Sequence, residues 1–118
     1  MSFDLNVFPP TGPTLAQVHL MQKTGQGLEG SPGDGNSSSD PEMAAFIDQL
    51  ERRWPTLEED PVASPWSSSL WLPPAGAGTE LNIQWQHAGV MRPAILQIAA
   101  HTKVIVYDPQ SDELILPA

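Results

Sequence analysis

Apolar and polar residues alternate in two stretches of the chain, and this pattern predicts two strands that each have one covered face. In residues 2–8 the apolar positions are Phe3, Leu5 and Val7. In Leu81–His87 the residues expected on the covered face are Leu81, Ile83, Trp85 and His87. A period of two is typical of a sheet that has one buried side and one solvated side.

A third pattern lies near the end of the chain. Val104, Ile105 and Val106 form an unbroken β-branched run within Lys103–Tyr107, which predicts an inner strand covered on both faces. The following residues, Asp108–Asp112, contain a proline and two aspartates and are typical of a turn. We therefore expect Glu113–Leu116 to return as a hairpin strand.

Two helices are expected to cover the sheet. The first, Asp40–Trp54, begins with a capping aspartate and a proline at the first helical position. Its apolar residues fall on one stripe and are Met43, Phe46, Ile47, Leu50 and Trp54. The second helix, Pro93–His101, is apolar almost throughout, which predicts that it is largely buried. We take Pro93 as its first residue.

The remaining segments are shorter or irregular. Thr14 and Gln17 have the spacing of a capping box and predict a helix in which Leu15 and Val18 face inward. A short strand is expected at Leu70–Leu72, with a hairpin loop between it and Leu81. Residues 25–39 are rich in Gly and Ser and predict a flexible loop. Their G-x-G-x-x-G spacing follows a helix instead of a strand, so we do not expect a dinucleotide site.

This order of elements predicts an α/β (α+β) fold, a two-layer sandwich formed by a single domain of residues 1–118. We expect a ferredoxin-like antiparallel or mixed sheet with helices on one face and an added C-terminal hairpin strand. The helices Asp40–Trp54 and Pro93–His101 should cover the face that carries Phe3, Leu5, Val7, Ile83 and Trp85.

Composition narrows the possible functions. The 118 residues include fourteen acids and five Lys or Arg, for a formal net charge of −9. This balance disfavours nucleic-acid binding, because phosphate contacts need clustered bases. There is no cysteine, which excludes disulfides and thiol chemistry. The N-terminus lacks a basic region and a long apolar run, so we expect no membrane span and a cytoplasmic location.

Candidate catalytic groups are scattered. The histidines His19, His87 and His101 are far apart and have no zinc-binding spacing. Ser67–Ser69 lack the glycines of a nucleophile elbow. We therefore expect no catalytic residue, no metal and no cofactor, and we predict that the protein is not an enzyme. The alternative is a small enzyme or ligand-binding domain with a pocket near His87 and Tyr107.

Acidic and amide side chains supply the candidate binding surface. Nine acids lie between Glu29 and Asp60, against Arg52 and Arg53. Such a surface either keeps the protein soluble or matches a basic partner. The predicted wet sheet face adds short amides and acids. It is either a binding patch with Trp71 as its aromatic anchor or an ordinary solvated face with Trp71 tucked under a loop. The residues predicted to bind a partner are Asp4, Asn6, Asp40, Glu42, Asp48, Glu51, Glu58, Glu59, Asp60, Trp71, Asn82, Gln84 and Gln86.

The chain contains three short motifs: residues 1–5 (MSFDL), Ser64-Pro65-Trp66 after an acidic loop, and Tyr107-Asp108-Pro109-Gln110. In this layout the chain resembles a group of small bacterial proteins that includes immunity proteins of polymorphic toxin systems. The central Gly/Ser loop departs from that group. The resemblance implies a cytoplasmic protein that neutralises a toxin by occluding its active-site cleft, and it assigns no functional residue.

Overall fold

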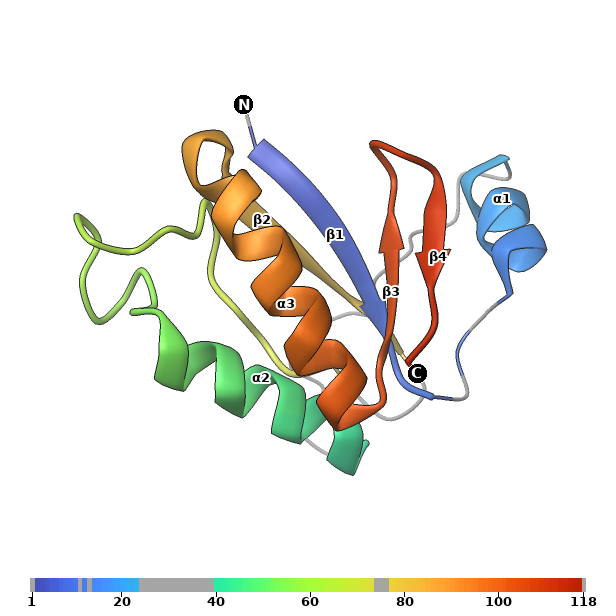
Figure 1. The fold of residues 1–118 in the computed structure, drawn as a ribbon, viewed down its shortest axis with the longest axis horizontal. Coiled ribbons are helices and arrows are strands. Elements are labelled where there is room, and N and C mark those ends of the chain that lie inside the picture. The colour runs from blue at the N-terminus through green and yellow to red at the C-terminus, as the bar shows by residue number, and fades with distance from the viewer. Residues whose placement is uncertain (1, 11, 13, 24–39, 74–76, 118) are drawn as a thin grey trace.

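The computed structural model describes residues 2–10, 12, 14–23, 40–73 and 77–117. Its central strand is β1 (Ser2–Phe8), which pairs on one side with β2 (Thr79–Gln84) and on the other with β3 (Ile105–Asp108). The last strand, β4 (Glu113–Ile115), pairs with β3 as the predicted C-terminal hairpin. Three helices pack around this sheet: α1 (Leu15–Lys23), α2 (Pro41–Arg53) and α3 (Ala88–Thr102) (Figure 1).

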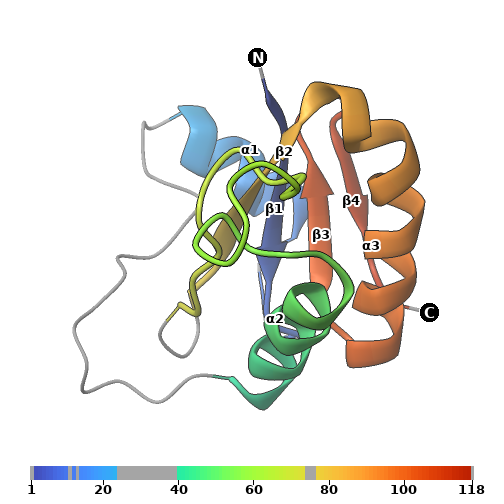
Figure 2. The same ribbon diagram turned by 90° about the vertical axis from the view of Figure 1, so that its left-hand side faces the viewer.

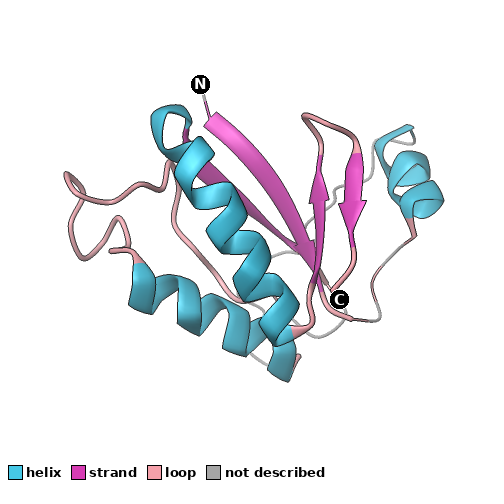
Figure 3. Ribbon diagram, viewed as in Figure 1, coloured by secondary structure: helices cyan, strands magenta, loops and turns pink. Residues whose placement is uncertain are grey.

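The strand order is β2-β1-β3-β4, and every neighbouring pair is antiparallel. Because β2 and β3 are both antiparallel to β1, they are parallel to each other, and α3 connects them across β1 (Figure 3). The sheet therefore contains a split β-α-β unit, which is typical of a ferredoxin-like arrangement. The predicted two-layer α/β sandwich with an antiparallel sheet is confirmed.

The main core lies between the sheet and the helices α2 and α3. Leu5 and Val7 of β1 contribute to it, as the alternation predicts. The predicted stripe of α2 is also confirmed, since Met43, Phe46 and Leu50 are fully buried there. Each large apolar side chain buried in this way contributes about 1.5–3 kcal/mol to folding. The last member of the stripe, Trp54, is half-buried at the rim.

A smaller cluster lies on the opposite face of the sheet, where α1 covers β3. It joins Phe8, Val18, Ile105 and Tyr107, and Figure 2 shows α1 and α3 on opposite sides of the sheet. The predicted capping box starts α1: Thr14 N–H donates to Gln17 Oε1 at 2.8 Å and Gln17 N–H donates to Thr14 Oγ1 at 3.2 Å. Helices α2 and α3 thus share the predicted face, and β3 is covered on both sides, by α1 on one face and by α2 and α3 on the other.

The boundary between β2 and α3 differs from the prediction. The strand ends at Gln84, a single 3₁₀ turn η1 (Trp85–His87) follows, and α3 begins at Ala88. Pro93 therefore lies inside the helix and does not start it. Trp85 is 53% exposed, so its predicted place in the core is wrong. The reason is the helical period, which begins five residues before the proline: Ala88, Met91, Ala94, Ile95 and Ile98 are all buried on one side.

A second correction concerns the outer edge of β2. The predicted strand at Leu70–Leu72 does not form. Instead, the segment 65–67 lies beside β2: Ser67 N–H donates to Asn82 O at 2.7 Å, and Gln84 N–H donates to Pro65 O at 2.8 Å. Trp66, which bridges to Ile83, is fully buried. Its indole packs edge-on against Trp54 with ring centroids 5.9 Å apart. This segment covers the polar edge of β2, which would otherwise be open to pairing.

Two glycines give a matched test of this packing. A Cβ added at Gly78 would lie 2.8 Å from Val7 O and 2.6 Å from the Phe8 ring, whereas one added at Gly89 meets nothing within 4 Å. We expect Gly78→Ala to lower the free energy of unfolding by about 1–3 kcal/mol through overpacking. Gly89→Ala, in the first turn of α3, should raise it by up to about 1 kcal/mol through helix propensity. Urea denaturation of the two variants checks this, and equal effects would contradict the packing around Phe8.

Candidate functional site

The face of the sheet opposite α2 and α3 carries a connected group of acids beside the area that α1 covers. Asn82 of β2 lies directly across from Asp4 of β1. Its amide nitrogen donates to Asp4 Oδ1 at 2.7 Å and to Glu80 Oε1 at 2.6 Å. The amide oxygen of the same side chain accepts from Ser68 Oγ at 2.6 Å. One fully bonded asparagine therefore holds two carboxylates close together on the surface.

Glu58, in the turn that follows α2, contacts the same segment that bonds Asn82. The Ser69 hydroxyl donates a hydrogen bond to Glu58 Oε1, one residue along from the Ser68 that bonds Asn82. This bond from Ser69 is the main reason that the pKa of Glu58 lies below its ordinary value. Glu58 is therefore ionised at neutral pH. We call Asp4, Glu58, Glu80 and Asn82 the acidic sheet face.

The backbone of Asp4 is fixed by a side chain from the β3–β4 turn. Gln110 Oε1 accepts from Asp4 N–H at 3.0 Å, and Gln110 Nε2 donates to Asp4 O at 2.8 Å. Continuing the β1–β3 register by two residues beyond Asn6 and Tyr107 would place Pro109 opposite Asp4. Proline has no N–H to donate. The side-chain amide of Gln110 takes the place of a backbone partner from β3, and it bonds both the N–H and the C=O of Asp4.

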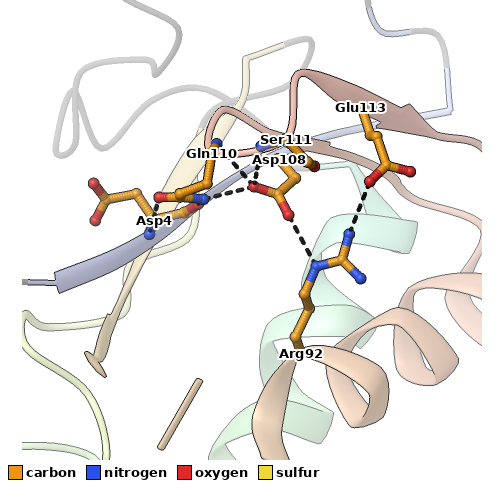
Figure 4. A network of polar contacts seen from close by, with 6 residues as sticks. All are labelled: Asp4, Arg92, Asp108, Gln110, Ser111 and Glu113. Atoms are coloured by element: carbon orange, nitrogen blue, oxygen red, sulfur yellow. Dashed lines mark hydrogen bonds and ion pairs between the residues drawn. The ribbon is translucent and has the colours of Figure 1, made fainter. Parts of the chain in front are cut away.

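The same glutamine reaches a buried ion pair, which Figure 4 shows from close by. Asp108 is 2% exposed, and its Oδ1 accepts from Gln110 Nε2 at 2.6 Å and from Gln110 N–H at 2.9 Å. Its Oδ2 accepts from Arg92 Nε of α3 at 2.9 Å, and Arg92 Nη2 lies 3.6 Å from Glu113 Oε1. Burial alone would raise the pKa of Asp108, but the bonds from Arg92 and Gln110 outweigh it and hold the pKa below its ordinary value.

The structure separates the residues predicted for the wet sheet face. Asp4, Asn82 and Gln84 do lie on it, and Gln86 reaches it from η1 by donating to Gln84 Oε1 at 3.0 Å. Asn6 points to the same side but is 2% exposed, so it is no part of an open surface. Its Oδ1 has no hydrogen-bond partner among the described residues.

For Trp71 the structure favours the second of the two alternatives, a side chain that is partly covered. It is half-buried, and its backbone oxygen accepts a bond from Thr79 Oγ1 at 3.5 Å. Trp85, which the sequence places in the core, is the more exposed of these two tryptophans. The exposed aromatic side chain therefore lies at the start of α3.

The predicted acids of α2 and its N-cap form a second surface, because α2 covers the opposite face of the sheet. Asp48 pairs with Arg52 at 2.8 Å on the exposed side of α2. The turn after α2 uses its acids for local capping: Glu59 accepts from Thr56 Oγ1 at 3.2 Å, and Asp60 Oδ1 accepts from Val62 N–H at 3.1 Å. The other predicted acids of this surface are Asp40, the N-cap of α2, with Glu42 and Glu51 on the helix itself.

Several residues of the site were not predicted from the sequence. Glu80 was not predicted. It lies two residues before Asn82 and four before Gln84 and so points to the same side of β2, which means that the alternation of polar residues begins at Glu80. No sequence pattern identifies Ser68 or Gln110, because their hydrogen bonds join segments that are distant in the chain.

A histidine contact was also missed. His19 Nε2 lies 2.7 Å from Asp112 Oδ1, which also accepts from Tyr107 Oη at 2.8 Å. The hydrogen bonds from His19 and Tyr107 lower the pKa of Asp112. This contact connects α1 to the β3–β4 turn. The flexible loop and the G-x-G-x-x-G spacing discussed above lie outside the described residues.

Among the described residues, no group of three or more His, Cys, Asp or Glu side chains is placed to hold a metal ion. Within the same ranges, no helix is long and apolar enough to cross a membrane. Tyr107 packs beneath α1, whereas His87 is exposed at the N-cap of α3. Comparisons with protein-family models, with curated proteins and with solved structures found no match.

The buried ion pair predicts a pH-dependent stability. A carboxylate whose pKa is lowered on folding stabilises the protein above its unfolded pKa, near 4, and loses that contribution as the pH falls through its folded pKa. We expect Asp108→Asn to lower the free energy of unfolding by about 2–3 kcal/mol at pH 7, because Arg92 loses its buried partner. The difference between wild type and variant should shrink below about pH 4.

The matched control is Asp48→Asn, which breaks an exposed ion pair on α2. It should cost less than about 1 kcal/mol at any pH. Chemical denaturation at a series of pH values measures both variants. A pH-independent difference for Asp108→Asn would show that the carboxylate charge is not what stabilises this network.

Proposed function

We propose that this chain is a protein-binding module whose acidic sheet face receives a basic surface of its partner. We further propose that the partner is a bacterial toxin and that the chain is its cytoplasmic immunity protein. The observation that carries the binding proposal is the pair of carboxylates, Asp4 and Glu80, held by a single Asn82 amide. The toxin as partner rests on the sequence resemblance, the small size and the acidity of the chain.

The acidic sheet face is favoured over the acids of α2 because Glu80 and Glu58 accept hydrogen bonds from the neutral Asn82 amide and Ser69 hydroxyl. On α2, in contrast, Asp48 already has an arginine partner on the same helix. A carboxylate held by a neutral hydrogen-bond donor keeps its full charge for an incoming base. The sheet face therefore presents the stronger attraction for a cationic surface.

Rigidity adds to this preference. Asp4 and Glu80 lie on paired strands, and Gln110 holds the backbone of Asp4 from the adjacent turn. Side chains fixed in this way lose little conformational entropy when a partner binds. Complementary charge also speeds the encounter of two proteins, with a strong dependence on salt.

The proposed mechanism is occlusion. A toxin that acts on an anionic substrate needs a basic cleft, and fixed carboxylates on a protein surface imitate the negative charge of such a substrate. Bound across the cleft, the acidic sheet face would exclude the substrate sterically and neutralise the cleft electrostatically. This mechanism needs no reactive group on the immunity protein.

The test uses the toxin candidate encoded beside this gene in its native genome. We expect the two purified proteins to form a complex, and co-expression of this chain to restore growth to cells that make the toxin. Asp4→Lys combined with Glu80→Lys should weaken the complex at least roughly tenfold, mainly through slower association. Surface plasmon resonance at two salt concentrations measures both rates.

The matched control is Asp48→Lys combined with Glu51→Lys on α2, which changes the net charge by the same amount. This control should leave the affinity within roughly threefold of wild type, because rim or distant charges contribute little. Equal weakening by both double variants would mean that only net charge matters. The absence of any complex would refute the proposed toxin partner.

A further inference from the structure

A groove of about 340 Å³ lies between α2 and α3, which pack side by side on one face of the sheet (Figure 1). Its lining residues are Gln49, Arg52 and Arg53 from the second half of α2 and Ile98 from α3. Ile98 is 8% exposed and belongs to the main core. Two guanidinium groups and one side-chain amide therefore border a small apolar area.

Both charges that line this groove are positive, although the chain as a whole has a formal net charge of −9. Bases in the last turn of a helix are favoured by the helix dipole, which explains why arginines occur at the end of α2. The dipole does not explain their direction. Consecutive residues of an α-helix project about 100° apart, so Arg52 and Arg53 border one groove only because both side chains turn toward it.

Contacts with neighbouring residues already position both guanidinium groups. Arg52 Nε lies 2.8 Å from Asp48 Oδ2, and Asp48 is the one carboxylate that pairs with Arg52 in the described part of the chain. The guanidinium of Arg53 lies over the Trp54 ring, 5.2 Å from its centroid. Within the same part of the chain, Arg53 has no carboxylate partner. The two arginines and Asp48 together carry a net charge of +1, which a single carboxylate would neutralise.

We propose that this groove binds the side chain of a glutamate from an acidic segment of a partner protein. The N–H edges of the two guanidinium groups match the two oxygens of a carboxylate. The methylene groups of the glutamate would cover Ile98, and the amide of Gln49 can donate to the same carboxylate. Because the arginines are positioned before the ligand arrives, binding costs less conformational entropy.

A phosphate group fits the charge of this groove less well. The phosphate of a phosphoserine carries a charge of about −1.5 to −2 at neutral pH, which exceeds the net charge of +1 at the groove. The excess negative charge would be repelled by a chain that is itself strongly acidic. The single charge of a glutamate leaves no such excess.

A second copy of the chain is a poorer occupant. Its acidic sheet face has the right sign of charge, but a contact between two different faces would continue from copy to copy. Each added copy brings a formal net charge of −9, so repulsion grows with the length of the assembly. The groove and the acidic sheet face also lie on opposite sides of the sheet. The groove proposal therefore does not rest on the proposed function.

The test is an NMR titration of the full chain with capped, glycine-flanked pentapeptides that differ only in their central residue, namely glutamate, glutamine or phosphoserine. We expect the glutamate peptide to shift the signals of the Arg53 Nε–H and the Gln49 side-chain amide, with a dissociation constant on the order of 1–10 mM. The glutamine peptide has the same shape without the charge and should bind at least roughly threefold more weakly. Added salt should weaken the binding of the glutamate peptide, because the groove is open to solvent.

Variants on the exposed side of α2 separate the contributions without disturbing the core. Arg52→Gln and Arg53→Gln should each weaken binding of the glutamate peptide at least roughly threefold. Asp48→Asn removes the carboxylate that competes for Arg52 and should strengthen binding roughly twofold. The matched control is Lys103→Gln, which removes the same charge from an exposed residue at the C-cap of α3, outside the groove. The control should change the affinity by less than roughly 1.5-fold.

Four outcomes would overturn the proposal. Equal binding of the glutamine peptide would show that the groove does not recognise charge, and tighter binding of the phosphoserine peptide would assign it to phosphoryl groups. Equal weakening by Lys103→Gln would mean that only net charge matters. Concentration-dependent shifts of the Arg53 signal without peptide would make a second copy the occupant. None of these results bears on the toxin experiment, whose decisive variants lie on the other side of the sheet.

Discussion

The structure depends on the strict alternation of β1, because this strand is paired on both sides. Its odd residues Phe3, Leu5 and Val7 face α2 and α3, and its even residues face the other way. A slip of one residue in either pairing would exchange the two faces along the whole strand. The main core and the acidic sheet face are therefore two consequences of one register.

The register of β1 also explains why the turn between β3 and β4 matters for the surface. β3 pairs with only the second half of β1, from Asn6 to Phe8. Gln110 takes over where the strand pairing ends, and the same side chain bonds Asp108, the buried partner of Arg92. One glutamine thus links the position of Asp4 on one side of the sheet to the anchoring of α3 on the other.

Most of the fold could be predicted from local patterns, and the two errors have different causes. Alternation identified β1, the β-branched run identified β3, and the apolar stripe identified α2. Pro93 misled the prediction because proline is common at the first position of a helix, whereas the helical period in fact begins at Ala88. The strand expected at Leu70–Leu72 was wrong because the pairing with β2 falls at residues 65–67 instead, and such pairing leaves no periodic signal in the segment itself.

The sequence by itself determined which residues are apolar, how they alternate and that the chain is strongly acidic. These properties are local, and they were enough to predict the sandwich and a charged surface. Only the tertiary structure decided that Asp4 and Glu80 come together at Asn82 while the acids of α2 lie on the opposite side. It also decided that Trp85 is exposed beside Arg92. The physical reason is that such groupings arise from register and helix position, which join residues that are distant along the chain.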